Sequence, residues 1–328
     1  MSLIDRYLSY IRNVRRYSEN TVRIYHDALD DFAGLVHGSG YVSDDELVES
    51  LNHSEIRRYV AQSMEKGLSA RTVNLHLSAL SGFCRYLMKE GCLKSNPVKL
   101  VTKPKQARRV PDFFKKDAMT AYFERTSYVL DKDELEFFIQ NHDTRSGKAM
   151  YENRLARLII SMLYSLGVRR AELIGLSVGD VDFGRKVVKV HGKGDKMREI
   201  PLIVSLCEEI LLYLKAVETM CGGKRSLTEP LLVTYAGRRL YPVYVDRAVK
   251  NELGGARDIA GRKSPHILRH SLATGLMNEG ADISSIKELL GHSSLAATQV
   301  YTHGSIARLK TNYELAHPRA KNGGKHGD

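Results

Sequence analysis

The sequence has few cysteines and no long apolar run, and these absences exclude several classes of protein. Its four cysteines, Cys84, Cys92, Cys207 and Cys221, are scattered and form no CxxC pair. They predict reduced, partly buried thiols of a cytosolic protein, and argue against a disulfide framework or a zinc site. No apolar run reaches the roughly 18 residues of a membrane span. The N-terminal segment MSLIDRYLSYIRNVRRY also lacks the apolar core of a signal peptide. We therefore expect a cytoplasmic protein with no membrane partner.

The charge, in contrast, is strongly positive. The chain has 328 residues, with 50 lysines and arginines against 38 aspartates and glutamates, which gives a net charge of +12. Residues 1–110 carry +5 of this excess and the remainder carries +7. Because no cationic tail accounts for the excess, the pattern favours a polyanion contacted along the whole molecule. The length predicts two domains.

The first part of the chain shows the periodicity of short amphipathic helices. Ser18 and Ser69 are each placed to cap a helix. The second of these helices carries one apolar stripe, made of Val73, Leu77, Leu80, Cys84 and Leu87. Four polar residues lie off that stripe and form either a solvated face or a surface laid against DNA: Arg71, Asn74, Ser78 and Arg85.

Composition divides the chain further. Residues 1–94 are predicted to form an all-α domain, and residues 95–111, SNPVKLVTKPKQARRVP, an extended basic linker. Residues 112–317 are predicted to form an α+β domain of helices with a small antiparallel sheet, so the fold class is mainly α. The sheet is expected at 185–202, where VVKV and EIPL flank the turn HGKGDK. Residues 318–328 are expected to be a disordered tail.

Four short segments could supply the groups that cleave a phosphodiester without a metal. Such chemistry needs guanidinium groups on the non-bridging oxygens, an in-line nucleophile and a proton for the leaving oxygen. In GVRRAEL, Arg169 is predicted to start a helix, with Glu172 placed to orient it. In HGKGDK, Lys193 occupies a glycine-flanked turn, from which a lysine can reach a leaving 5′-oxygen. Taken alone, each is more often a surface ion pair or a solvated lysine.

The other two segments lie toward the C-terminus. In SPHILRHSLATGL, Ser264 and Pro265 predict a helix start, so that His266 and Arg269 project from one side of its first turn. In DISSIKELLGHSSLAATQVYTH, a helix is predicted to end at Gly291 and to place His292 at its tip, with Tyr301 about two turns into the next helix. HxxR and a single tyrosine are each weak signals.

In combination, order and spacing, these residues resemble the signature of the tyrosine recombinase, or phage-integrase, family. The resemblance spans nearly the whole chain, and the ending YTHGSIARLKTNYELAHPRA is most similar to the Xer branch. It implies that residues 1–94 are a DNA-binding core-binding domain and that 112–317 are the catalytic domain. Residues 112–130 then look like an insertion. They leave open whether the role is Xer-like chromosome dimer resolution or integration or inversion by a mobile element.

The resemblance also implies roles for the site residues. Tyr301 would attack the scissile phosphate, forming a 3′-phosphotyrosyl link and releasing a 5′-hydroxyl. Arg169 and Arg269 would hold the non-bridging oxygens, while His292 would donate a further hydrogen bond to the phosphate. Lys193 would be the general acid, and His266 would help to manage the tyrosine proton. These six residues are the expected catalytic set.

The same resemblance implies the partners and the absence of cofactors. The expected partner is double-stranded DNA, bound at two sites by a tetramer of this chain, with or without a paralogous recombinase. Its C-terminal arm would dock on a neighbouring subunit. No metal and no ATP would be needed, because the phosphotyrosine keeps the phosphodiester energy. The segment GGKRS lacks the first glycine of a phosphate-binding loop, since Glu218 takes its place.

Three other functions remain open on the sequence alone. A type IB topoisomerase shares the tyrosine chemistry, although a core-binding domain and a C-terminal arm argue against it. A DNA-binding protein with a decayed active site is the second, and the complete residue set argues against decay. The third is a metalloenzyme using His266, His270 and His292, although no carboxylate occupies the expected position of its base.

Overall fold

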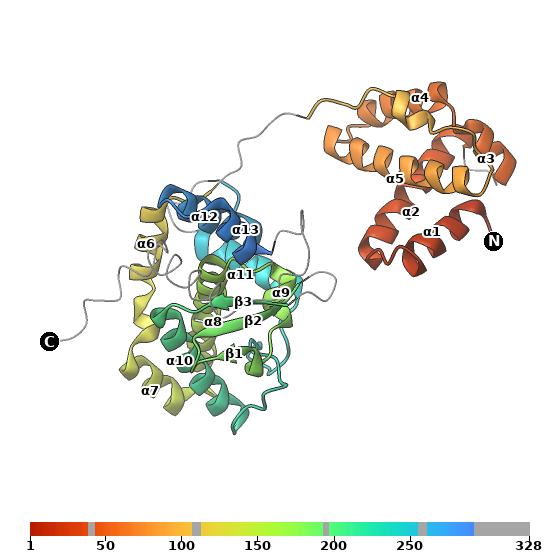
Figure 1. Cartoon of the computed structure of the whole chain (residues 1–328). Coiled ribbons are helices and arrows are strands. Elements are labelled where there is room, and N and C mark those ends of the chain that lie inside the picture. Colours follow the sequence, from red (N-terminus) through yellow and green to blue (C-terminus); the bar gives the residue numbers. More distant parts are fainter. Residues whose placement is uncertain (39–42, 107–112, 193–196, 255–260, 292–328) are drawn as a thin grey trace. The chain divides into compact units, whose positions relative to one another are not determined.

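The structure is a computed structural model that describes residues 1–38, 43–106, 113–192, 197–254 and 261–291. The chain divides into two compact units, Met1–Val110 and Pro111–Asp328, each with its own core. Each unit is described separately below (Figure 1).

The first unit is helical. Ser18 and Ser69 cap two of its helices as predicted, because their hydroxyl groups accept hydrogen bonds from the backbone N–H groups of Thr21 and Thr72. All five residues of the predicted apolar stripe are buried in the core. The elements are α1 (Leu3–Asn13), α2 (Glu19–His37), α3 (Asp44–Ser50), α4 (His53–Glu65), α5 (Ala70–Lys89) and the 3-10 helix η1 (Pro97–Leu100).

The beginning of the expected linker belongs to this first core. Val98 and Val101 are buried, and η1 packs against α4 and α5. The side-chain amide of Asn96 donates to the carbonyl and the hydroxyl of Ser81 on α5. The prediction of an extended linker from residue 95 is therefore wrong for 96–101. The two valines are three residues apart, and burying their apolar side chains in the core stabilises the fold.

The second unit is built around α8 (Arg145–Leu166). Every residue from 157 to 166 is buried, because α7, α9, α10, α11 and α12 all pack against this helix. A helix that is surrounded on all sides carries apolar residues over most of its surface, as this part of α8 does. The other elements are α6 (Lys116–Arg125), η2 (Ser127–Leu130), α7 (Lys132–Asn141), α9 (Arg170–Gly175), η3 (Val178–Asp180), α10 (Val204–Cys221), α11 (Pro242–Gly254), α12 (Pro265–Asn278) and α13 (Ile283–Leu290).

A small antiparallel sheet lies on this helical body, with strand order β1-β2-β3. Its strands are β1 (Val181–Asp182), β2 (Val187–His191) and β3 (Met197–Pro201). The register pairs Val188 with Ile200 and Val190 with Arg198, and all four side chains are buried. The predicted hairpin is confirmed. Part of its turn, including Lys193 and Gly194, lies outside the described residues.

The segment expected to be an insertion contributes to the core of the second unit. Met119 and Tyr122 of α6 are fully buried, and Val129 of η2 is buried beside them. The backbone N–H of Phe114 donates to the hydroxyl of Ser271 on α12 at 2.7 Å. Residues 113–130 therefore help to hold α12, which carries two of the predicted site residues.

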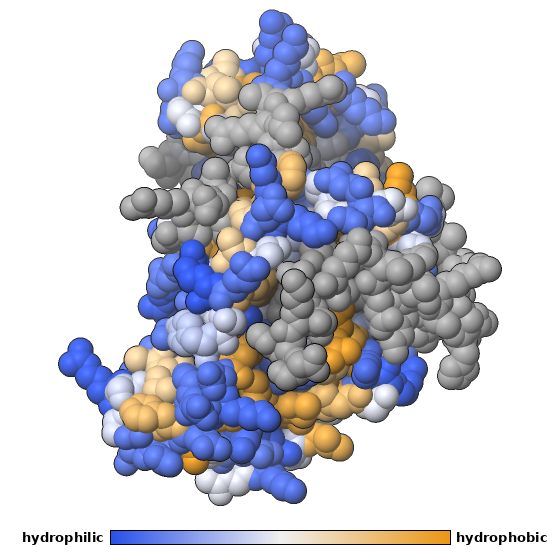
Figure 2. Space-filling model, turned by 90° about the vertical axis from the view of Figure 1, so that its left-hand side faces the viewer, coloured by the Kyte–Doolittle hydropathy of each residue, from blue (hydrophilic) through white to orange (hydrophobic). Residues whose placement is uncertain are grey.

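The fold class is as predicted: mainly α, with a small antiparallel sheet in the second unit. The cysteines are free thiols, of which Cys84 and Cys207 are buried. Hydrophilic residues cover much of the surface seen in Figure 2, with apolar patches between them. Within the described ranges, no helix is both long and apolar enough to span a bilayer.

Candidate active site

Arg169 lies at the junction of two helices, as the sequence predicts. The helix α8 ends at Leu166, and Gly167 takes the left-handed conformation with φ of 59°. The next helix, α9, begins directly after Arg169. The backbone N–H of Arg169 donates to Glu172 at 2.8 Å, and its guanidinium donates to the same carboxylate at 2.7 Å. This double contact fixes the direction of the Arg169 side chain, which is still 42% exposed.

Glu172 is shared by two arginines. Arg198 of β3 donates to both oxygens of the Glu172 carboxylate, at 3.2 Å and 2.8 Å. Burial by itself raises the pKa of Glu172. Hydrogen bonds from Arg198, and from the backbone and side chain of Arg169, outweigh burial and bring the pKa to about 2. Glu172 is therefore an anion at neutral pH.

Arg269 is the fifth residue of α12 and is buried, with 6% of its surface exposed. Its guanidinium donates to the backbone carbonyls of Gly167 and Leu290. The pKa of Arg269 is lowered to about 10, mainly because burial penalises its charge and secondly because the positive charge of Arg169 is close. Arg269 thus remains a cation at neutral pH.

The C-terminal end of α13 brings the three arginines together. Its last carbonyls accept one hydrogen bond each: Leu289 from Arg198, Leu290 from Arg269, and Gly291 from Arg169. Cations are favoured at this end of a helix, where the macrodipole is negative. We call Arg169, Arg198, Arg269 and Glu172 the arginine cluster. Figure 1 shows α13 lying beside α12, near the sheet that carries Arg198.

The arginine cluster has an excess of positive charge. The cluster has three guanidinium groups and one carboxylate, which Arg169 and Arg198 contact, and the backbone carbonyls that accept the other hydrogen bonds are neutral. Arg169 is the exposed member, while Arg198 and Arg269 are each 6% exposed. An arrangement of this kind can bind a phosphate, because guanidinium groups donate to two oxygens at once and stay charged.

His266 is on the same helix as Arg269 but lies apart from the cluster's hydrogen bonds. It is exposed in the first turn of α12, where Ser264 is the N-cap residue and Pro265 the first helical residue. The Ser264 side chain makes no capping hydrogen bond. Within the described ranges, no hydrogen bond links His266 to Arg169 or Arg269.

Lys193, His292 and Tyr301 lie outside the described residues. Gly291, which precedes His292 in the sequence, is the C-cap of α13 with φ of 63°, so the predicted helix end is confirmed. Of the histidines considered for a metal, only His266 and His270 are described. Among the described residues, no three His, Cys, Asp or Glu side chains form a group that could hold a metal ion.

Sequence reasoning missed Arg198. A signal was present in the alternation of β3, where Arg198 and Ile200 share the inward face and Met197 and Glu199 are less buried. An arginine at an inward position of a strand requires a buried anion, and Glu172 is that anion.

Two family models match this chain. The model of the phage integrase family matches residues 128–308, and that of the phage integrase N-terminal SAM-like domain matches residues 4–91. The chain belongs to the phage integrase family. Its curated relatives include the tyrosine recombinase XerC of Chlorobaculum parvum, which is 32% identical over 97% of this chain and 94% of its own length. The tyrosine recombinase XerC of Bacillus subtilis is also 32% identical, over 97% of each chain.

Solved structures support the fold. The integrase of the Tn1549 transposon, in complex with transposon right-end DNA, aligns with a TM-score of 0.62 at 19% identity, over 94% of this chain and 98% of that chain. A lambda integrase dimer bound to a core site aligns with a TM-score of 0.60 at 16% identity, over 99% of this chain and 78% of that chain. The protein is thus a tyrosine site-specific recombinase, as the sequence predicts. Neither an inactive DNA-binding protein nor a type IB topoisomerase is favoured.

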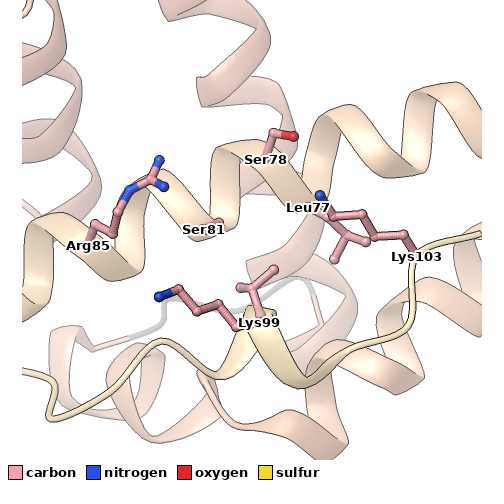
Figure 3. A pocket seen from close by; sticks show the side chains of 7 residues that line it. Leu77, Ser78, Ser81, Arg85, Lys99 and Lys103 are labelled. Carbon is pink, nitrogen blue, oxygen red and sulfur yellow. The ribbon is translucent and has the colours of Figure 1, made fainter.

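The first unit of the recombinase has a basic hollow of about 210 Å³ between α5 and residues 98–103. It is lined by Leu77, Ser78, Ser81, Arg85, Val98, Lys99 and Lys103. Figure 3 shows Lys99 and Lys103 extending toward α5, which carries Ser78 and Arg85. The three cations are exposed, and no carboxylate is among these described lining residues. We call this the basic groove.

Two of the four polar residues that lie off the α5 stripe are held by backbone carbonyls. The amide of Asn74 donates to the carbonyl of Pro104 at 3.0 Å, which ties residues 102–105 to α5. The Ser78 hydroxyl donates to the Asn74 carbonyl. Arg71 and Arg85 are exposed, and Arg85 lines the basic groove.

Proposed function

We propose that the recombinase cleaves and rejoins double-stranded DNA at a phosphate bound by Arg169 and Arg269, with Tyr301 as the nucleophile. The observation that carries this proposal is the convergence of the two arginines on the end of α13. They come from segments one hundred residues apart and share one positively charged cluster. In the sequence, His292 directly follows this end of α13, and Tyr301 comes nine residues after His292.

In the proposed reaction, the phenolate oxygen of Tyr301 attacks phosphorus. A bond forms between that oxygen and phosphorus, while the bond from phosphorus to the 5′-oxygen breaks. Lys193 donates a proton to the departing 5′-oxygen, and His266 accepts the proton of the phenol. Arg169, Arg269 and His292 donate hydrogen bonds to the non-bridging oxygens, whose negative charge increases in the transition state. Attack of a 5′-hydroxyl on the phosphotyrosine reverses these steps and reseals a strand.

The basic groove supports contact with DNA by the first unit. Its three cations can neutralise backbone phosphates, and the hydroxyl of Ser81 on α5, which accepts a hydrogen bond from Asn96, can donate its proton to a phosphate oxygen. Such contacts position a protein on a duplex without reading its sequence. The similar solved structures include an integrase in complex with transposon DNA and one bound to a core site, which is consistent with this use.

The finer parts of the function also belong to this proposal. The relatives named XerC support a Xer-type exchange between two DNA sites. We propose that four copies, or copies of this chain with a paralogous recombinase, assemble on those two sites. Chromosome dimer resolution and the integration or inversion of a mobile element are the two outcomes to be separated. The cytoplasmic location expected from the sequence remains a prediction.

The test is the capture of a covalent adduct. The full chain is incubated with a pool of nicked duplexes tiled across its own genomic neighbourhood, so that cleavage beside a nick releases a short fragment and traps the protein. Adducts that map to Tyr301 by mass spectrometry support the proposal. Tyr301→Phe should retain DNA affinity and form no adduct, while Tyr313→Phe, in the same C-terminal segment, is the matched control.

Adducts on another residue, or equal adduct yields from Tyr301→Phe and the unmodified chain, would overturn the mechanism. A parallel relaxation assay on supercoiled DNA and a two-site exchange assay then define the outcome. Strand exchange between two captured sites is expected.

A further inference from the structure

Arg198 is a buried cation that the proposed mechanism does not use. It lies on the inward face of β3, paired with Val190, and only 6% of its side chain is exposed. Burying an isolated charge is very costly, so a guanidinium in this position must be fully paired. The arrangement of its partners shows what the charge can do there.

All three nitrogens of the Arg198 guanidinium donate hydrogen bonds. Nη1 and Nη2 donate to the two oxygens of Glu172, and Nε donates to the backbone carbonyl of Leu289 at 3.0 Å. A Cβ atom on Gly291 would lie 3.1 Å from Nη1 of Arg198, so the chain passes closely over the guanidinium at this glycine. Arg198 therefore joins β3 both to the carboxylate that orients Arg169 and to the end of α13.

We infer that Arg198 is a positioning residue of the cleavage reaction: it holds Glu172 against Arg169 and fixes the end of α13, from which the chain continues to His292 and Tyr301. The inference rests on the proposed function of those residues. Because all three nitrogens of Arg198 donate to Glu172 and Leu289, it acts through these two groups and does not contact the phosphate. The hairpin that carries Lys193 in its turn thereby shares a rigid contact with the Arg169 segment.

The inference predicts a change in pH dependence as well as in rate. The charged groups that face Glu172 are Arg169 on its own segment, Arg198 on β3 and Arg269 on α12. Removal of Arg198 takes away the strongest contact that lowers the pKa of Glu172, while burial continues to raise that pKa. Glu172 would then gain a proton at a higher pH than in the unmodified chain, and a neutral Glu172 orients Arg169 poorly.

The experiment uses the full chain and the nicked duplex trapped by the unmodified protein. Single-turnover adduct formation is measured at saturating protein for Arg198→Gln and Arg198→Lys between pH 5 and pH 8.5. Arg198→Gln should lower the rate constant about 100-fold, the size of effect that misplacement of catalytic groups produces. The dissociation constant for DNA should change less than about threefold, since no phosphate contact is lost.

Two further variants make the test specific. Arg185→Gln removes an exposed bidentate pair with Glu199 on the same sheet and should leave rate and pH profile unchanged. Arg198→Lys keeps the buried charge, and so the fold, but a single ammonium cannot bridge Glu172 and Leu289. It should lower the rate constant about tenfold. Glu172→Gln combined with Arg198→Gln should slow the reaction less than the product of the two single effects, because both substitutions remove the same ion pair.

The outcomes are distinct. A lower adduct amplitude with an unchanged rate constant and pH profile would mean that Arg198 serves only folding, and the inference would be wrong. It would also be wrong if Arg198→Lys matched the unmodified chain at every pH. If the unmodified chain forms no adduct with any duplex, the proposed function fails instead.

Discussion

Substitution of Gly167 by alanine should disturb the packing that holds the arginine cluster. Gly167 has φ of 59°, and a Cβ at this position would lie 2.7 Å from Leu290 Cδ2 and 2.8 Å from Leu272 Cδ2. Both leucines are buried, on α13 and α12 respectively. Since carbon atoms in contact are normally about 3.5–4.0 Å apart, the helices must move or the leucines must leave their rotamers.

The expected loss can be worked out from two contributions. A non-glycine residue in the left-handed conformation costs about 1 kcal/mol, and overpacking of a filled core adds about 2 kcal/mol. Gly167→Ala should therefore lower the free energy of unfolding by about 3 kcal/mol. Because the carbonyl of Gly167 accepts a hydrogen bond from Arg269, the rate of adduct formation should fall as well.

Gly222 provides the matched control. It caps α10 with φ of 73°, and nothing lies within 4 Å of an added Cβ. Gly222→Ala should cost only the conformational contribution of about 1 kcal/mol and leave the adduct rate unchanged. Unfolding is followed in urea by far-UV circular dichroism, and hydrogen exchange of peptides from α12 reports on the second unit alone. Equal destabilisation by the two alanines would refute the close packing at Gly167.

Three other outcomes are expected. Because the pKa of Glu172 in the fold is about 2 and its ordinary value is 4.5, its ionisation contributes about 3 kcal/mol of stability above pH 4.5 that is lost as the pH falls toward 2. The difference in unfolding free energy between the unmodified chain and Glu172→Gln should shrink over that range, and a constant difference would contradict it. Arg169→Lys should lower the single-turnover adduct rate about 100-fold with DNA affinity nearly intact, because an ammonium cannot replace the bidentate guanidinium. The double variant Lys99→Gln, Lys103→Gln should make the negative slope of log affinity against log salt concentration less steep by about 2, as measured by fluorescence anisotropy. Lys66→Gln should leave this slope unchanged.

Much of the fold could be predicted because local signals and packing agree. Ser18 and Ser69 cap helices, and Gly167 and Gly291 end them, since each of these residues favours its position for a local reason. The β2–β3 hairpin follows from its alternating residues and its glycines. The start of the linker was harder to predict, because Val98 and Val101 lie among prolines and lysines, and only the tertiary fold gives them a core to enter.

The site divides in the same way. Arg169 and Arg269 could be proposed, because their order and spacing with the other candidates resemble the family signature, and Glu172 because it lies three residues after Arg169. The partnership of Glu172 with Arg198 could not be found, since it joins residues 26 positions apart on different elements. The hydrogen bond from Arg269 to the carbonyl of Gly167, 102 residues earlier in the chain, also has no signal in the sequence pattern. Such contacts depend on how α8, α12 and the sheet pack together.

The choice of acceptors explains how the arginine cluster can be both ordered and receptive to phosphate. If each arginine were paired with its own carboxylate, the cluster would be neutral and would have little attraction for a DNA backbone. Here Arg169 and Arg198 share one carboxylate, that of Glu172. All three arginines also donate to neutral carbonyls at the end of α13, and Arg269 donates to the carbonyl of Gly167 as well. The carbonyl dipoles fix the direction of each guanidinium without cancelling its charge, so in the proposed site the guanidinium groups are held in place before an anion binds. Donors that need no reorganisation are the form of electrostatic stabilisation that lowers a reaction barrier most effectively. The same hydrogen bonds fix the end of α13, so the proposed binding of the phosphate and the position from which the chain continues toward Tyr301 depend on one set of contacts.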